Sequence, residues 1–389
     1  MENTYLIKCG KLFDGINLCI KDNIEILVDK GLIVDISKNI PLRNNIKIID
    51  LTENLVTPGL IDAHIHPEFF EWKKLYNDYH KYTDEWIALA ALYTAQKTLE
   101  RGFTTIRVMG SLSREYGLLD VKNSINSGYF NASKIIVSPH SFSSTGGHGD
   151  LSQIVKTNPN ISSVLSSKSI GSGVDFFTEA TRRSIKYGAD FIKIIVSGGF
   201  STSGDSPYEQ QLNDDELIAI ISTARERDIP VTAHAYTPKI IKKLIKFGIN
   251  GIEHGSLIDD ETAGIMEEKG VYLVPTFSPF DKIILDESIG GINKNKSFED
   301  KLVKYKEELI KGREIILKSK IKLGLGSDHV YSYNSYESWR EYKSWVDNGI
   351  NPLVALRSAT SINAEILGID NRGSLKKGNK ADIVAWNKN

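Results

Sequence analysis

Cysteine is nearly absent from this chain of 389 residues, with only Cys9 and Cys19, both near the N-terminus. Two cysteines cannot form a disulfide framework or a thiolate metal cage, so we expect both thiols to stay reduced. Long apolar runs are missing too. No segment approaches the roughly 20 apolar residues of a membrane span, and the first residues lack the apolar core of a signal peptide. We therefore expect a soluble cytoplasmic protein with no membrane partner.

An excess of charge of either sign is the third absence. The chain has 48 Lys and Arg against 49 Asp and Glu. Without a broad basic surface it lacks the field that holds nucleic acid, so we expect no nucleic-acid partner. A small molecule or a dipeptide is the expected substrate, and association into a homo-oligomer stays open.

The apolar residues that are present change their spacing along the chain. Short alternating runs broken by turn residues fill the N-terminal segment, and a further strand-like run follows Gly378 at the other end. Such spacing is typical of a small antiparallel sheet. We expect residues 1–57 plus 369–389 to form a small β-sheet (sandwich) domain from both chain ends, and residues 58–368 to form a second domain.

Between these ends, apolar strand-like runs alternate with helical segments, a pattern typical of βα units and a parallel sheet. Eight strands are predicted, at 59–66, 104–110, 134–140, 191–197, 231–236, 251–254, 271–277 and 322–329. Eight helices follow them, at 84–101, 114–127, 175–187, 214–227, 238–247, 259–269, 298–318 and 351–358. The predicted fold class is therefore α/β, a (β/α)8 TIM-type barrel with the small β-sandwich domain attached.

Potential metal ligands end several of these predicted strands. His64 and His66 lie on one face of the first, because side chains alternate along a strand and recur about 6.5–7 Å apart. Alone, the pair could also be two surface histidines. A barrel of this type has its active site at the carboxyl ends of its strands. Six potential ligands from five strands meet there, which favours a metal site: His64, His66, Lys193, His234, His254 and Asp328.

Lys193 is the unusual member, because an ammonium group has no lone pair for a metal. Its neighbours Ile192, Ile194 and Ile195 predict burial, which lowers a lysine pKa. A neutral amine can react with carbon dioxide to give a carbamate, whose two oxygens could each bind one ion. The alternative is a lysine whose head pairs with a carboxylate.

Several motifs together resemble the amidohydrolase superfamily of metal-dependent hydrolases over nearly the whole chain. They are, in order, Gly59-Leu60-Ile61-Asp62-Ala63-His64-Ile65-His66, Asp190-Phe191-Ile192-Lys193, His234, Ile252-Glu253-His254-Gly255, Gly326-Ser327-Asp328 and the closing Lys380-Ala381-Asp382. The resemblance implies two divalent metal ions, with zinc expected. It implies that His64, His66 and Asp328 bind one ion and His234 and His254 the other. It further implies a carboxylated Lys193 between the ions, and Asp328 as the general base.

Loop motifs narrow the resemblance to the branch with prolidase-like dipeptidases and Xaa-basic carboxypeptidases, often labelled imidazolonepropionase-related. They are Ser144-Thr145-Gly146-Gly147-His148-Gly149-Asp150, Ser197-Gly198-Gly199-Phe200 and His234-Ala235-Tyr236. In that branch the positions of His148 and Tyr236 contact the substrate. The alternatives are a simple turn residue for His148 and strand-end packing for Tyr236.

Two histidines depart from the pattern of that branch. His140 stands where the resemblance leads us to expect arginine, and His329 stands where relatives usually have a small residue. Both lie at the ends of predicted strands. They either bind the substrate and alter its choice or lie at the rim of the pocket.

The resemblance implies hydrolysis of a peptide or amide bond by a metal-activated hydroxide, since a metal ion lowers the pKa of bound water to near 7. We expect a dipeptide or an N-acyl amino acid as substrate. Ring opening of a cyclic amide, imidazolone or lactone is the alternative reaction. A non-catalytic metal-binding scaffold is the alternative of another class. Deamination is disfavoured, because no acidic residue closely follows Tyr236.

Overall fold

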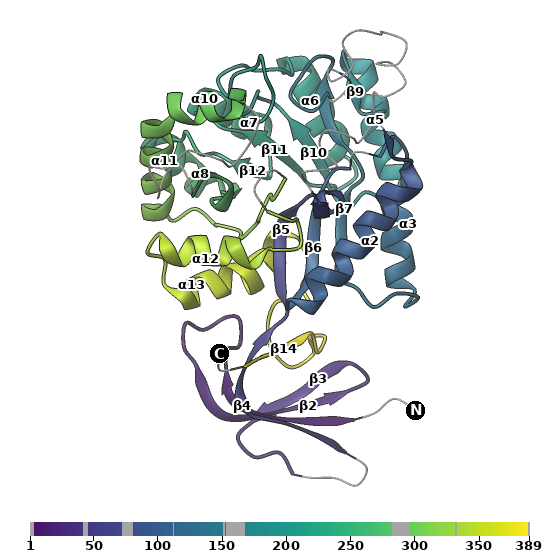
Figure 1. The fold of residues 1–389 in the computed structure, drawn as a ribbon, viewed down its shortest axis with the longest axis vertical. Coiled ribbons are helices and arrows are strands. Elements are labelled where there is room, and N and C mark those ends of the chain that lie inside the picture. Colours follow the sequence, from purple (N-terminus) through teal and green to yellow (C-terminus); the bar gives the residue numbers. More distant parts are fainter. Residues whose placement is uncertain are drawn as a thin grey trace.

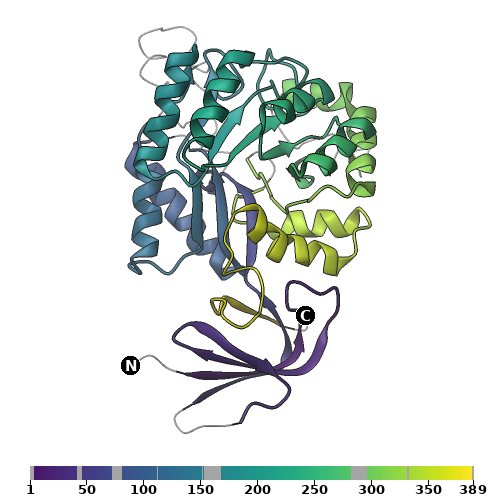
Figure 2. The same cartoon turned by 180° about the vertical axis from the view of Figure 1, so that it is seen from behind.

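The computed structural model describes residues 4–41, 46–71, 81–111, 113–150, 152, 168–281, 296–330 and 333–387. Figure 1 shows a larger part, in which helices surround parallel strands, and a smaller sheet below it. Seen from behind in Figure 2, the C-terminus again lies beside the small sheet. Among the described helices, none combines the length and the apolar composition that a bilayer crossing demands.

The small sheet has five strands from both ends of the chain, in the order β14-β4-β1-β2-β3. Its strands are β1 (Tyr5–Leu12), β2 (Lys21–Asp29), β3 (Leu32–Ser37), β4 (Lys47–Pro58) and β14 (Ile383–Trp386). As predicted, the C-terminal strand returns to pair with the N-terminal part, antiparallel to β4. The strands form one sheet in the described residues, so the two-layered sandwich and the domain boundaries stay predictions.

Two parallel sheets form the larger part. One contains β5 (Leu60–Ile65), β6 (Phe103–Met109) and β7 (Lys134–Ser138). The other runs in the order β13 (Tyr272–Val274), β12 (Gly251–His254), β11 (Val231–Ala235), β10 (Ile192–Ile195), β8 (Ser141–Ser144) and β9 (Ile170–Gly171). The central strands β10, β11 and β12 are buried at every position, as expected for parallel strands covered on both faces.

The predicted third strand, 134–140, is wrong beyond Ser138. The strand ends at Ser138, and Pro139 and His140 separate β7 from β8. As a result β7 pairs with β6, whereas β8 pairs with β10. Proline has no N–H for the ladder, which explains why the strand ends there. The sequence prediction missed β8, because its residues Ser-Phe-Ser-Ser have few apolar side chains.

The predicted eighth strand, 322–329, is not a regular strand, but its backbone connects the two sheets. Leu273 N–H donates to Lys322 O (3.0 Å), and Gly324 N–H donates to Leu273 O (2.8 Å). On the other side, Ala63 N–H donates to Leu325 O (2.9 Å). The described residues therefore have a TIM-barrel-like arrangement of parallel sheets rather than eight regular strands.

Helices cover the outer faces of these sheets (Figures 1 and 2). They are α2 (Asp84–Glu100), α3 (Gly117–Asn126), α5 (Val174–Tyr187), α6 (Asp214–Arg225), α7 (Pro238–Phe247), α8 (Asp260–Lys269), α10 (Lys296–Lys304), α11 (Lys306–Lys318), α12 (Trp339–Asp347), α13 (Pro352–Arg357) and α14 (Asn363–Ile366). Short turns of helix are η1 (Pro67–Glu71), η4 (Ser278–Phe280) and η5 (Ser358–Ile362). The predicted helix 298–318 is two helices, divided at Tyr305.

Local signals explain why several of these helices begin and end where predicted. A capping box of Asn213 and Glu216 opens α6, and the Asp259 side chain accepts from Thr262 N–H to open α8. Gly248 and Gly270 end α7 and α8 in the left-handed conformation. The main hydrophobic core lies between these helices and the six-stranded sheet, and it holds the carboxyl ends of the strands in place.

Candidate metal centre

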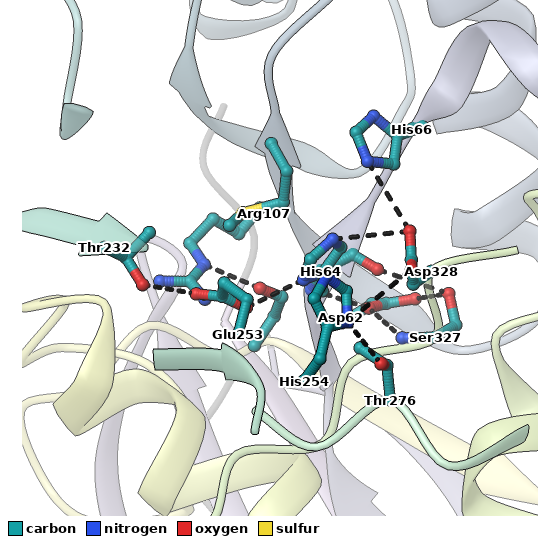
Figure 3. A network of polar contacts seen from close by, with 12 residues as sticks. Asp62, His64, His66, Arg107, Thr232, Glu253, His254, Thr276, Ser327 and Asp328 are labelled. Carbon is teal, nitrogen blue, oxygen red and sulfur yellow. Dashed lines mark hydrogen bonds and ion pairs between the residues drawn. The ribbon is translucent and has the colours of Figure 1, made fainter. Parts of the chain in front are cut away.

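Three of the predicted ligands converge at the carboxyl ends of the strands. The ligand atoms of His64, His254 and Asp328 all lie within 4.8 Å of one another. Asp328 Oδ1 is 3.4 Å from His64 Nε2 and 3.5 Å from His66 Nε2. Figure 3 shows His64, His66 and His254 gathered around the Asp328 carboxylate. The structure thus brings His64 and His66, near the start of the larger part, next to Asp328, near its end.

Backbone geometry aims these side chains. Asp328 N–H donates to His64 O at 2.8 Å, which fixes the eighth segment against β5. Asp328 (φ 47°) and His254 (φ 72°) both have left-handed backbone conformations. Such conformations are uncommon for residues other than glycine, and they cluster at functional sites.

Asp62 secures the same junction. Its carboxylate accepts from Ser327 Oγ (2.6 Å), Ser327 N–H (3.1 Å) and His64 N–H (3.0 Å). Burial raises the pKa of Asp62, whereas these donors lower it. Asp62 therefore positions His64 directly, and it positions Asp328 through the neighbouring Ser327.

His234 and His254 form the second group, with ring centroids 4.6 Å apart. Burial lowers the pKa of both imidazoles well below the usual value, so both are neutral. His234 Nε2 is buried and has no hydrogen-bond partner among the described residues. A buried polar nitrogen without a partner is costly, and a metal ion would satisfy it. The donor set therefore fits a metal of the type that binds imidazole and carboxylate.

Lys193 on β10 is 3% exposed, in the apolar surroundings that the sequence predicts. Its pKa is lowered to about 8, mainly by burial and also by the positive charge of Arg107. Glu253 and Asp328 act in the opposite direction. None of the ion pairs in the described part of the chain includes Lys193, so the alternative of a lysine head paired with a carboxylate finds no support there.

Asp328 is ionised. Burial alone would raise the pKa of its carboxyl, but the charges and hydrogen bonds of His64, His66 and Lys193 hold that pKa well below its usual range. Burial lowers the pKa of His66 to about 4. At neutral pH the site therefore presents a carboxylate beside a neutral imidazole, the forms that bind metal.

The predicted substrate residues His148 and Tyr236 lie against the metal histidines. The His148 ring stacks on His234, with centroids 4.9 Å apart, and the Tyr236 ring stacks on His254 at 5.2 Å. His148 Nδ1 is 2.8 Å from Asp205 Oδ2. Burial raises the pKa of the Tyr236 phenol well above its usual value, so the hydroxyl keeps its proton.

His140 and His329 are both buried, and they contact residues other than the proposed metal ligands. The His140 ring packs edge-on against Tyr116, with centroids 4.9 Å apart. His329 Nε2 is 2.8 Å from Ser278 Oγ. Burial lowers the pKa of His140 to about 4 and that of His329 to about 3. Their contacts in the described residues do not include a metal histidine, and their role in substrate binding stays a prediction.

Sequence reasoning assigned no role to Glu253 or Arg107, which lie beneath the site. Glu253 was part of the Glu-His-Gly motif, and Arg107 was the one charge in the apolar run of the predicted second strand. In the structure Arg107 Nη2 is 2.7 Å from Glu253 Oε1, and both are buried. A charged residue at an inward position of a strand was the signal that could have identified them.

Comparison with known proteins finds relatives over nearly the whole chain. The sequence profile of the Amidohydrolase family matches residues 55–389. An ochratoxinase from Aspergillus niger is 27% identical over 356 residues, 86% of this chain and 70% of that protein. The structure of a Xaa-Pro dipeptidase with methionine bound in its active site is 28% identical, with a TM-score of 0.85, covering 100% of this chain and 94% of that one. A prolidase complexed with N-methylphosphonate-L-proline is 26% identical, with a TM-score of 0.81, covering 100% and 93%.

Proposed function

This chain belongs to the amidohydrolase family and is a hydrolase of carbon–nitrogen bonds, and from that premise we propose that it cleaves a peptide or amide bond in a small substrate with a free carboxylate. A dipeptide or an N-acyl amino acid is the proposed substrate. The observation that carries the proposal is the stacking of His148 and Tyr236 on His234 and His254, because it places two polar groups beside the candidate metal ligands.

The proposed centre holds two divalent ions, with zinc expected. His64, His66 and Asp328 would bind one ion, and His234 and His254 the other. Carboxylated Lys193 would lie between them: its amine nitrogen bonds the carbon of carbon dioxide and releases one proton to solvent. The buried Lys193 amine and the partnerless His234 Nε2 support this assignment. When bound, the ions would lower the pKa of a water and polarise the scissile carbonyl.

Asp328 would carry the proton in this reaction. It is ionised at rest, and its Oδ1 lies between His64 and His66. A carboxylate in that position accepts the proton of the attacking water and then gives it to the nitrogen of the leaving amine. Its left-handed backbone, tied to His64 O, holds the carboxylate in place during both transfers.

His148 and Tyr236 would bind the substrate. Asp205 orients His148 through Nδ1, and Lys301 on α10 in turn donates to Asp205 and to the carbonyls of Gly199 (2.7 Å) and Thr202 (2.6 Å). Asp205 would thereby hold the His148 ring beside the substrate, with Nε2, which lies 3.2 Å from Ser201 Oγ, as the nitrogen that contacts it. The protonated hydroxyl of Tyr236 would donate to the carbonyl that is attacked.

The relatives support an amino-acid substrate. One solved structure of an enzyme similar to this chain holds methionine in its active site, and another is a prolidase complexed with a derivative of L-proline. Both proteins are named for hydrolysis next to proline. The similar ochratoxinase is named for a different substrate, so the side chain that this protein prefers must be measured.

The proposal can be tested with metal-free protein reconstituted with zinc and bicarbonate. We expect release of a free amino acid from members of a dipeptide and N-acyl amino acid library. The matched control is the same substrate with its terminal carboxylate amidated, which should be a much poorer substrate. Cyclic amides and lactones in the same panel test the alternative reaction. A fully metal-loaded protein that releases nothing from the library would refute the proposal.

A further inference from the structure

We propose that Glu253 is a positioning residue that holds His64 in the tautomer with hydrogen on Nδ1, leaving the lone pair of Nε2 free to bind metal. The inference rests on the proposed function only in taking His64 as a metal ligand. It concerns a side chain that does not itself face the ions.

Glu253 is fully buried at the end of β12 and has three hydrogen-bonding neighbours from three other strands (Figure 3). Its Oε1 accepts from Arg107 Nη2 at 2.7 Å and from Thr232 Oγ1 at 2.6 Å. Its Oε2 is 2.7 Å from His64 Nδ1. The carboxylate thus has one oxygen for the Arg107 and Thr232 donors and the other for His64.

The partners of Oε1 decide the role of Oε2. A guanidinium group is always charged and can only donate, so Glu253 is the anionic member of an ion pair with Arg107. An ionised carboxylate can only accept, and therefore His64 Nδ1 must carry the hydrogen. In a neutral imidazole the other nitrogen then has the lone pair. That nitrogen, Nε2, is the one that faces Asp328.

Arg107 keeps this arrangement in register with the metal site. Its Nε donates to Ala63 O at 2.6 Å, next to His64 in the chain, and its Nη1 donates to Tyr272 Oη at 2.8 Å. Every nitrogen of the guanidinium thus has a partner. The carboxylate cannot turn away from His64 without losing an ion pair inside the protein, which is strongly unfavourable.

Among the described residues, His254 has no carboxylate within hydrogen-bond distance of its Nδ1, since Asp328 Oδ2 is 3.8 Å from that nitrogen. Its Nδ1 is 2.8 Å from Thr276 Oγ1. A hydroxyl can donate or accept, so this contact leaves the tautomer of His254 undetermined. Glu253 therefore fixes His64 in a way that the hydroxyl at His254 does not.

The decisive variant is Glu253→Gln, which keeps the size but replaces one oxygen with an amide NH2. If the amide oxygen faces Arg107 and Thr232, the NH2 faces His64 Nδ1 and favours the wrong tautomer. The reverse orientation opposes the NH2 to Arg107. We expect zinc to bind about 10–100-fold more weakly to this variant. Thr232→Val is the matched control, because it retains the carboxylate, Arg107 and the His64 contact, and we expect it to bind zinc like the parent.

Zinc affinity is measured by competition with a chromophoric chelator, and folding by thermal melting of the metal-free proteins. A folded Glu253→Gln variant with the parent's affinity would overturn the proposal. If that variant does not fold, nitrogen-15 NMR of the zinc-loaded parent decides. We expect a protonated Nδ1 and a metal-bound Nε2 for His64, assigned with a His64→Asn variant; the opposite pattern refutes the inference. Neither measurement uses a substrate, so a silent substrate library would leave its result unchanged.

Discussion

Asp328→Asn isolates the proton-carrying step from metal binding. Asp328 Oδ1 lies 3.4 Å from His64 Nε2 and 3.5 Å from His66 Nε2, while its N–H is held by His64 O. The backbone contact does not involve the carboxylate, so the asparagine should occupy the same place. Its amide oxygen can still face an ion. What it cannot do is accept a proton from water and return it to the leaving amine.

The size of the loss follows from that difference. Removing a general base costs about 10²- to 10⁴-fold in kcat, which corresponds to about 3–5 kcal/mol of transition-state stabilisation. The zinc content should remain near that of the parent, because the other proposed ligands are unchanged. The melting temperature of the zinc-loaded protein should change little.

The assay compares kcat, zinc content and melting temperature of the zinc-loaded variant and parent. Asp259→Asn is the matched control. Asp259 caps α8 by accepting from Thr262 N–H at 2.8 Å, and asparagine caps as well as aspartate, so kcat and stability should both be retained. An Asp328→Asn variant that keeps its zinc and turns over within tenfold of the parent would refute Asp328 as the base.

Three further predictions concern the frame, the pH response and the bridging lysine. Gly312→Ala on α11 would place a Cβ 2.0 Å from Ser256 O, whereas Gly264→Ala on α8 would meet nothing within 4 Å; in urea unfolding we expect the first to lower the free energy of unfolding by about 1–3 kcal/mol and the second to raise it by about 0.5–1 kcal/mol. Equal effects would contradict the close approach of α11 to the loop after His254. Burial lowers the pKa of His140 to about 4 from its usual 6.5. As the pH falls, the unfolded chain therefore takes up this proton before the folded chain does. The free energy of unfolding should then fall by roughly 1 kcal/mol per pH unit between pH 6.5 and pH 4. Urea unfolding of metal-free parent and His140→Asn should show the shallower slope in the variant; parallel slopes would place the pH dependence elsewhere. Lys193→Met should bind fewer zinc ions per chain than the parent by elemental analysis and lose turnover, and a variant with the parent's zinc content would exclude the lysine from the bridge.

Periodicity predicted most of the fold because its elements carry strong local signals. The predicted strand at 251–254 and helix at 238–247 coincide with β12 and α7. The Gly248 that ends α7 and the Pro238 that begins it are both readable without a structure. The strand-end positions also predicted that His64, His254 and Asp328 meet, since carboxyl ends of parallel strands share one edge.

Contacts between distant segments could not be predicted in this way. The eighth segment, residues 322–329, is held by backbone hydrogen bonds to Leu273 and Ala63. Gly324 and Gly326 approach their neighbours too closely for a side chain, so these two positions lack the apolar side chains that a periodicity would reveal. A Cβ at Gly326 would lie 2.6 Å from His64 Cβ. The sequence around Asp205 does not indicate that Lys301 on α10 donates to it. The Glu-His-Gly motif likewise does not indicate which nitrogen of His64 its glutamate contacts.

The charges inside the strands bear on the class of substrate. Arg107 and Glu253 form an ion pair beneath the centre and cancel each other. The other negative groups beside the proposed ions are Asp328, the proposed carbamate on Lys193 and the Asp62 carboxylate, while His66, His234 and His254 are neutral at pH 7. Two divalent cations outweigh three negative groups. The loaded site would therefore attract an anion. For this reason we expect removal of the negative charge by amidation of the free carboxylate to weaken turnover more than a change of the substrate side chain.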